Sequence, residues 1–210
     1  MVTHAASRPA IAAAAAAPAD RLGGLSAIAL GATGLLYSLS FIVVKNDTLT
    51  AAMLGASGLL TLALFSALYE RLRAADAPLG RLALILGLLG AVGALVHGGY
   101  DLANALHPPA APNLDLPSAI DPRGLLTFGL GGLAVALVAT LLARDPAAPR
   151  ILPYLGYLTA ALMLVLYVGR LIILDAKHPL IVVVALLTGF LVSPAWNIWL
   201  GTTLLRERHP

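Results

Sequence analysis

Six long apolar runs constrain the fold of this chain more than any other feature. They cover residues 22–44, 49–69, 82–106, 124–142, 151–174 and 180–205. An α-helix needs about 20 apolar residues to cross the ~30 Å hydrocarbon core of a bilayer, and each run has about that length. Polar connections, most of which contain proline, separate the runs. The sequence therefore predicts an all-α, polytopic membrane bundle of six transmembrane helices.

The overall composition points to the same class of protein. Hydrophobic residues make up 60% of the 210 residues and charged residues only 11%, whereas soluble domains carry about 25% charged residues. The absence of cysteine excludes disulfides, thiolate metal sites and cysteine nucleophiles. The net charge of +3 comes without a basic cluster interleaved with aromatic residues, so nucleic acid is not an expected partner. The expected partner is the lipid bilayer.

The two ends of the chain differ from the apolar runs. Residues 1–21 are rich in alanine and contain Pro9 and Pro18. We interpret them as a mobile tail and not as a signal peptide, because the run at 22–44 is long enough to direct insertion by itself. Residues 206–210 are expected to form a short C-terminal tail.

The distribution of basic residues predicts the orientation in the membrane. Of the 13 Lys and Arg residues, nine fall on the side of the two termini and three on the other side. Arg170, the remaining one, lies inside the fifth run. Since cytoplasmic loops carry the excess of positive charge, both termini are expected in the cytoplasm. We expect a multi-pass protein of the bacterial cytoplasmic (inner) membrane.

Two parts of the chain also show weak sequence similarity to each other, which we call the internal echo. An offset of 71 residues places the second and third runs over the fourth and fifth, and 14 of the 61 residue pairs from Leu49 to Pro109 are identical. One interpretation is that these identities reflect only the composition of a membrane protein and the prolines of its turns. A duplicated hairpin with both copies in the same orientation is the other.

A polar stripe interrupts the third run close to its end. On a helix, one face carries the residues at positions i, i+3, i+4 and i+7, which here are His97, Tyr100, Asp101 and Asn104. Lipid cannot satisfy such a face, so it is expected to point toward other helices or a wet cleft. Gly98 and Gly99 remove side-chain bulk beside it and allow a backbone or ligand to come close.

Arg170 in the fifth run lies at a depth similar to that of Asp101. The sequence therefore predicts an ion pair between the two side chains, with Tyr167, Tyr37 and Ser40 adding hydrogen bonds. Together these residues would form a polar, outward-facing chamber between the third and fifth spans. They are the candidate ligand- or proton-binding residues.

Three interpretations of this cluster remain open at this stage. It can be a network that only fixes helix packing, a site for a ligand, ion or proton, or a case in which Arg170 merely reaches to the interface. A haem held by His97 with His107 or His178 is a remote alternative. A metal site at His97 and Asp101 lacks a third ligand, so no metal is predicted.

The last run contains "SPAWNIWLG", residues 193–201. Trp196 and Trp199 are interpreted as interfacial anchors. Pro194 is expected to kink the helix and to free a carbonyl, which Asn197 or a neighbour would satisfy. Asn197 and Trp196 also define a secondary, inner polar site.

Two segments carry a resemblance to known proteins. "LYERLRAADAPLGRLA" follows the second run and "PAWNIWLGTTLL" closes the last. With them, residues 22–206 resemble small uncharacterised bacterial membrane proteins grouped under domains of unknown function. The resemblance implies the six-span layout and no activity, and no site residue is carried over from it.

These observations support three functional hypotheses. The first is a non-enzymatic membrane protein, either a small binding module or an accessory subunit of a larger membrane complex, or a homo-oligomer. The second is a small-solute or proton-coupled transporter in which Asp101 and His97 exchange protons. A membrane enzyme comes last, because no nucleophile, base and orienting group occur at a recognisable spacing, and no catalytic residue is predicted.

Overall fold

The computed structural model describes residues 8–108, 122–175 and 177–206, and this part of the chain is helical without a strand. Six helices are long and apolar enough to cross a membrane: Pro18–Val44, Asp47–Leu72, Ala77–Leu106, Leu125–Ala143, Ile151–Ile172 and Pro179–Arg206. No boundary differs by more than five residues from that of the predicted run. The all-α fold class with six candidate spans is confirmed.

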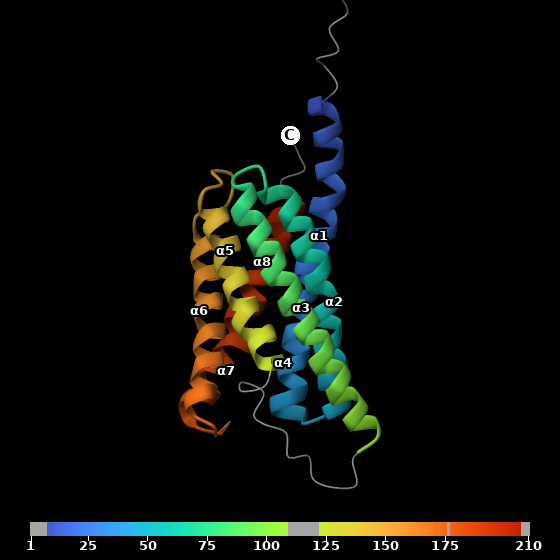
Figure 1. The fold of residues 1–210 in the computed structure, drawn as a ribbon, viewed down its shortest axis with the longest axis vertical. Coiled ribbons are helices and arrows are strands. Elements are labelled where there is room, and N and C mark those ends of the chain that lie inside the picture. Colours follow the sequence, from blue (N-terminus) through green and yellow to red (C-terminus); the bar gives the residue numbers. More distant parts are fainter. Residues whose placement is uncertain (1–7, 109–121, 176, 207–210) are drawn as a thin grey trace, which may run out of the picture.

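Three of the six spans, whose arrangement Figure 1 shows, contain both α-helical and π-helical segments. The first consists of α1 (Arg8–Ser38) and η1 (Leu39–Val44), and the second and third are α2 (Asp47–Leu72) and α3 (Ala77–Leu106). The fourth runs from the short α4 (Pro122–Gly124) through η2 (Leu125–Leu130) into α5 (Gly131–Ala143). The last two are α6 (Ile151–Ile172), and α7 (Pro179–Leu186) with η3 (Leu187–Val192) and α8 (Ser193–Arg206).

The N-terminal segment differs from the expected tail. α1 begins at Arg8, so residues 8–21 are helical, and only residues 1–7 of that tail lie outside the described part. Alanine has the highest helix propensity of all residues. Pro9 falls in the first turn, where the missing N–H has no intrahelical partner to lose. In Figure 1 the start of α1 projects beyond the other helices.

The spans form a closed ring in chain order. α1 packs on α2, α2 on α3, α3 on α5, α5 on α6, and α6 on the last span, while α8 packs back on α1. In Figure 1 the end of α8 and the start of α1 lie at the top, and we call this the upper end. The lower end carries the termini of η1, α3 and α6 and the start of α7.

Glycines allow two pairs of helices to approach backbone to backbone. A Cβ added at Gly98 on α3 would lie 2.6 Å from the backbone N of Gly55 on α2, and one added at Gly201 would lie 2.5 Å from the carbonyl O of Gly24. The expectation that Gly98 admits a neighbouring backbone is therefore confirmed. Gly99 is exposed, and a Cβ there would have no atom within 4 Å.

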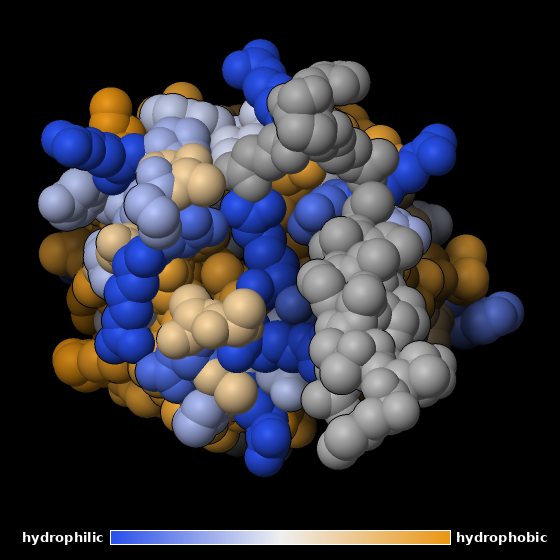
Figure 2. All heavy atoms as spheres, turned by 90° about the horizontal axis from the view of Figure 1, so that it is seen from above, coloured by the Kyte–Doolittle hydropathy of each residue, from blue (hydrophilic) through white to orange (hydrophobic). Residues whose placement is uncertain are grey.

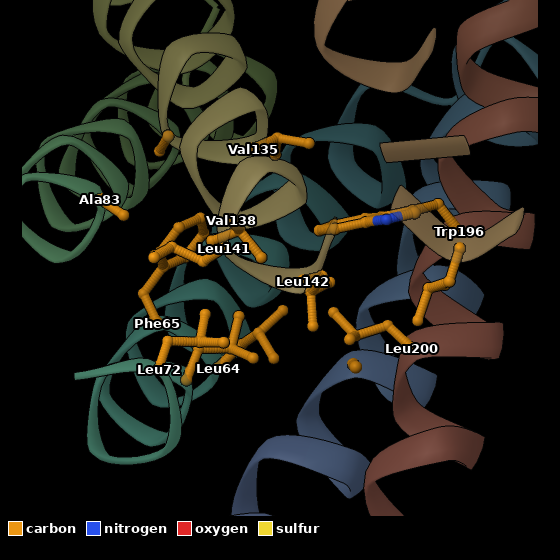
Figure 3. Close-up of a cluster of buried hydrophobic side chains, with 14 of the residues drawn as sticks. Leu64, Phe65, Leu72, Ala83, Val135, Val138, Leu141, Leu142, Trp196 and Leu200 are labelled. Atoms are coloured by element: carbon orange, nitrogen blue, oxygen red, sulfur yellow. The ribbon is translucent and has the colours of Figure 1, made fainter. Parts of the chain in front are cut away.

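The residues of the apolar core come from the upper half of the ring, and Figure 3 shows how their side chains cluster. It combines leucines from the upper parts of α2, α5 and α8 with aromatic and small residues from the neighbouring helices. The labelled members are Leu64, Phe65, Leu72, Ala83, Val135, Val138, Leu141, Leu142, Trp196 and Leu200.

Trp196 belongs to this core, and the prediction that it is an interfacial anchor is wrong, while the interfacial role of Trp199 stays a prediction. Trp196 is only 2% exposed, and Trp199 is partly buried against the same cluster. Small residues leave space for the indole of Trp196. A Cβ added at Gly156 would lie 2.8 Å from Nε1 of Trp196 and 2.9 Å from Cβ of Ala139. The indole therefore faces α5 and α6 and not the membrane surface.

Ion pairs connect the turns at the upper end, where Figure 2 shows hydrophilic residues gathered on the exposed face. Nη2 of Arg71 lies 3.1 Å from Oδ2 of Asp145, and Nη1 of Arg144 lies 3.0 Å from Oδ2 of Asp76. Asp76 is also the N-cap of α3, where its side chain accepts a hydrogen bond from the backbone N–H of Leu79. These contacts tie the α2–α3 turn to the α5–α6 turn.

Candidate functional site

A cavity of about 210 Å³ opens in the lower half of the ring, below the apolar core. Five of the six spans line it, all except α2. Its polar residues are Tyr37, Ser38, His97, Tyr167, Arg170 and Thr188, and its apolar walls include Phe41, Ile42, Phe128, Leu166, Ile181 and Ala185. We call it the lower cavity.

All three π-helical segments reach this cavity. η1 contributes Phe41 and Ile42, η2 contributes Phe128, and η3 contributes Thr188 and Gly189. π-Helical turns are rare and occur often at functional sites, because the wider turn redirects side chains. Their convergence on one cavity singles it out from the other hollows of the bundle.

Pro194 accounts for one of these segments. In a regular α-helix its ring would clash with the carbonyl of Phe190, four residues earlier. η3 ends at Val192, directly before that proline, and the chain continues as α8 from Ser193. The expected disturbance at Pro194 therefore takes the form of a π-helical segment, while Asn197 binds the carbonyl of Ser193 and not that of Phe190.

The polar stripe of α3 lies at the edge of the lower cavity. Nε2 of His97 is 3.2 Å from Oδ2 of Asp101, one turn further along the helix. The other carboxylate oxygen, Oδ1, is 3.7 Å from Nη1 of Arg123. The Arg123 guanidinium also lies over the ring of Tyr100, 4.5 Å from its centroid. Asp101 and Asn104 together line a separate hollow of about 240 Å³ beside Asp47 and Thr50.

The predicted ion pair between Asp101 and Arg170 is wrong. Asp101 turns to His97 on its own helix and to Arg123 at the start of the fourth span. The prediction matched the depths of the two residues in the membrane but not the rotation of α3. It also assigned Arg123 to a loop, whereas the helical α4 begins at Pro122 and brings Arg123 beside the stripe.

Arg170 instead binds the C-terminal end of its own helix. Its Nη1 donates to the carbonyls of Leu174 at 2.9 Å and of Ile173 at 3.4 Å. A cation in the last turn also interacts favourably with the helix dipole. Among the described residues no carboxylate forms an ion pair with Arg170. Since both hydrogen bonds use Nη1, Nε and Nη2 remain for another acceptor.

His97 also lines the lower cavity, and one of its ring nitrogens has no partner among the described residues. Its side chain is 12% exposed, and its Nδ1 is buried without a hydrogen-bond partner in the described part of the chain. A buried polar atom left in this way costs free energy unless a ligand or water satisfies it. His97 thus connects Asp101, through Nε2, to the lower cavity, whose wall it forms.

The other predicted residues divide into two groups. Tyr37 and Tyr167 line the lower cavity, and the ring of Tyr37 stacks on that of Phe41 with centroids 5.9 Å apart. Ser40 lies outside it: its Oγ donates to the carbonyl of Tyr37 and accepts from Oγ1 of Thr50. Ser40 therefore fastens the turn between the first two spans and takes no part in a network with Arg170.

His107 and His178, the two other histidines in the described part of the chain, have local roles at helix ends. Nδ1 of His178 accepts a hydrogen bond from the backbone N–H of Leu180 at the start of α7, and His107 is the C-cap of α3. Within residues 8–108, 122–175 and 177–206, no three histidine, aspartate or glutamate side chains gather closely enough to hold a metal ion.

The secondary site around Asn197 lies on the axis of the bundle. Asn197 is 6% exposed and lines a second cavity of about 190 Å³, which we call the inner cavity. Trp196 lines it as well, although its indole belongs to the core.

Several residues of the lower cavity carried no signal in the sequence. Phe128, Ile181 and Thr188 lie in runs that read as uniformly apolar spans. Of the two π-helical segments that carry Phe128 and Thr188, only η3 has a cue in the sequence, namely Pro194. Comparison with protein-family models, curated proteins and solved structures gives no match.

Proposed function

We propose that this chain is a non-enzymatic integral membrane protein that binds a small amphiphilic anion in the lower cavity. One observation carries the proposal: Arg170, which has no carboxylate partner among the described residues, lines the lower cavity. A cation without a counter-charge thus lines a hollow in a candidate membrane bundle.

The electrostatics of the bilayer favour an anion there. A guanidinium within a candidate span costs several kcal/mol unless it is paired or hydrated. The carbonyls of Ile173 and Leu174 satisfy part of its hydrogen-bonding capacity but do not neutralise its charge. A carboxylate or phosphate would do both, through the Nε and Nη2 donors.

The walls of the cavity define the rest of the ligand. Phe41, Phe128 and Ile181 offer apolar surface beside the polar groups, so the ligand should join one anionic group to a short apolar part. A cavity of about 150 Å³ holds benzene, and the lower cavity has about 210 Å³. A medium-chain carboxylate such as octanoate fits this description better than a complete lipid.

The predicted topology implies on which side of the membrane the binding site opens. With both termini in the cytoplasm, the upper end faces the cytoplasm and the lower cavity faces outward. The proposed location is the inner membrane of a bacterium, in keeping with the resemblance to small bacterial six-span proteins. The proposed role is that of a binding module, alone, as a homo-oligomer or as an accessory subunit of a larger complex.

Equilibrium dialysis of radiolabelled octanoate against the protein in nanodiscs tests the proposal. We expect saturable binding that Arg170→Gln weakens by about tenfold or more, since a hydrogen bond to a charged group contributes about 1.5–3 kcal/mol. Arg73→Gln is the matched control, because Arg73 pairs with Glu70 at the upper end. Octanol, which lacks the charge, should compete poorly. Equal octanoate affinity in the wild type and Arg170→Gln would refute the proposal.

A second candidate function is a proton-coupled transporter. The contact that favours it is the 3.2 Å approach of His97 Nε2 to Asp101 Oδ2, which joins two titratable groups at the cavity wall. Proteoliposomes distinguish the two functions. Uptake of octanoate that follows an imposed pH gradient and is lost in Asp101→Asn would favour transport, whereas binding without pH-driven uptake favours the binding module.

A further inference from the structure

The inner cavity lies at the centre of the ring, and residues from all six spans line it. Unlike the lower cavity it contains no charged side chain. Its polar lining consists of Ser57, Thr61, Thr127, Thr159, Ser193 and Asn197. Its chemistry is therefore that of neutral hydrogen bonding.

The amide of Asn197 leaves one polar atom without a partner. Its Nδ2 lies 2.9 Å from the carbonyl O of Ser193, and since a carbonyl can only accept, the atom facing it must be the NH₂ group. The amide oxygen Oδ1 then has no hydrogen-bond partner in the described chain. The residue is 6% exposed, so bulk solvent does not satisfy this acceptor.

Thr127 on η2 presents a second unsatisfied group. Its Oγ1 is buried and has no partner in the described part of the protein. The neighbouring hydroxyl of Thr159 donates to the carbonyl of Leu155 at 2.9 Å, as is usual for threonine in a helix. Thr127 and Asn197 thus depart from the pattern of the other polar residues, and both line the same cavity.

The inner cavity lies one helical turn deeper in the bundle than the lower cavity. On α1 the lining moves from Ser38 to Gly34, and on α3 from His97 to Ala94. On α6 it moves from Tyr167 to Met163, and in the last span from Gly189 to Ser193. Three or four residues separate the members of each pair, which is one turn of a helix. The two hollows therefore follow one another along the axis of the ring.

We propose that the inner cavity is a hydrated site for small uncharged hydrogen-bonding molecules, water foremost, which enter it from the lower cavity. Water would donate to Oδ1 of Asn197 and bond to Oγ1 of Thr127. The volume of about 190 Å³ exceeds what one molecule needs, because a water requires only about 10–15 Å³ of such space and two to four polar partners. The site does not depend on the anion proposed for the lower cavity.

Radiolytic footprinting of the protein in nanodiscs tests this directly. Hydroxyl radicals formed from water inside the cavity would oxidise Met163, which lines it. Gly34→Val fills the space, because Gly34 also lines the cavity and a Cβ there would meet no atom within 4 Å. We expect Met163 oxidation to fall severalfold in Gly34→Val. Gly99→Val, the same exchange at an exposed glycine with equally open space, should leave it unchanged.

A stability measurement gives a second, independent readout. Thr127→Val keeps the shape of the side chain and removes only the unpartnered hydroxyl. If the cavity is hydrated, this hydroxyl bonds to water and its loss lowers the melting temperature. In a dry cavity, removal of an unsatisfied buried hydroxyl raises the melting temperature.

The two experiments can each overturn the proposal. Met163 oxidation that is equal in the wild type and Gly34→Val, or a higher melting temperature of Thr127→Val, would show that water does not occupy the cavity. Octanoate binding to the lower cavity could still be intact in that case, so failure of this proposal and failure of the proposed function are distinguishable.

Discussion

Arg144 and Asp76 are separated by 68 residues, and Nη1 of Arg144 donates to Oδ2 of Asp76 over 3.0 Å. The same carboxylate caps α3 through the backbone N–H of Leu79. With the Arg71–Asp145 pair beside it, this contact fastens the upper end of the ring. The bundle is thus closed by charges and a packed core at one end and hollow at the other.

The Asp76 carboxylate makes the stability of this closure depend on pH. The Leu79 N–H, and secondarily Arg144, lower the pKa of Asp76 below its ordinary value of 3.8. A group with a lowered pKa stabilises the fold above its unfolded-state pKa, and the stabilisation is lost as the pH falls through the folded-state pKa. We expect the melting temperature in detergent to decrease as the pH is lowered below 3.8. The decrease should be smaller in Asp76→Asn. An equal acid-induced decrease in both proteins would contradict this role.

The crossing of α2 and α3 can be tested at two adjacent glycines. Gly98→Ala would place a methyl group 2.6 Å from the backbone N of Gly55, and such overpacking costs about 1–3 kcal/mol. We expect a clear decrease in melting temperature. Gly99→Ala adds the same methyl group to open space and should change stability little. Equal effects of the two substitutions would mean that α3 is rotated from its described position.

Double-mutant cycles can identify the partner of Asp101. Asp101→Asn combined with Arg123→Gln should show a coupling free energy of about 0.3–1 kcal/mol, the range for a partly exposed ion pair. Asp101 is 42% exposed, so a larger value is not expected. The cycle of Asp101→Asn with Arg170→Gln should show no coupling. Coupling to Arg170 and none to Arg123 would restore the pairing predicted from the sequence.

The tryptophans provide a spectroscopic test of the core. The chain has two tryptophans, so Trp199→Phe leaves Trp196 as the only indole. We expect blue-shifted emission that acrylamide quenches poorly, because Trp196 is 2% exposed. Trp196→Ala should destabilise the protein by about 3–5 kcal/mol, as loss of a buried tryptophan does. Red-shifted, readily quenched emission would contradict the burial of Trp196 and indicate that it lies at the membrane interface.

The span boundaries could be predicted from the sequence because they depend on local properties. Apolar length and proline-rich turns mark each end of a helix, and the one large difference is at α1, where alanine propensity extends the helix back to Arg8. The grouping of His97, Tyr167 and Arg170 around one hollow was also predictable, since all three lie at similar depth in their spans.

The details of the site depend on rotation and register, which the sequence does not encode locally. Asp101 pairs with Arg123 because α4 begins at Pro122, and Trp196 is buried because Gly156 leaves space for its indole. The internal echo does not predict ion-pair partners either. The 71-residue offset aligns Arg73 with Arg144, but Arg73 pairs with Glu70 on its own helix, whereas Arg144 pairs with the distant Asp76. Whether a duplication underlies the echo stays a prediction.

Photo-crosslinking with a medium-chain fatty acid that carries a diazirine tests the central claim most directly. Irradiation in nanodiscs should label residues of the lower cavity, namely Phe41 on η1, Leu166 on α6 and Ile181 on α7, which line its apolar wall. Excess octanoate should abolish this labelling, and Arg170→Gln should reduce it severalfold. Labelling confined to exposed side chains such as Ile85 and Val92, insensitive to octanoate and to Arg170→Gln, would contradict the account.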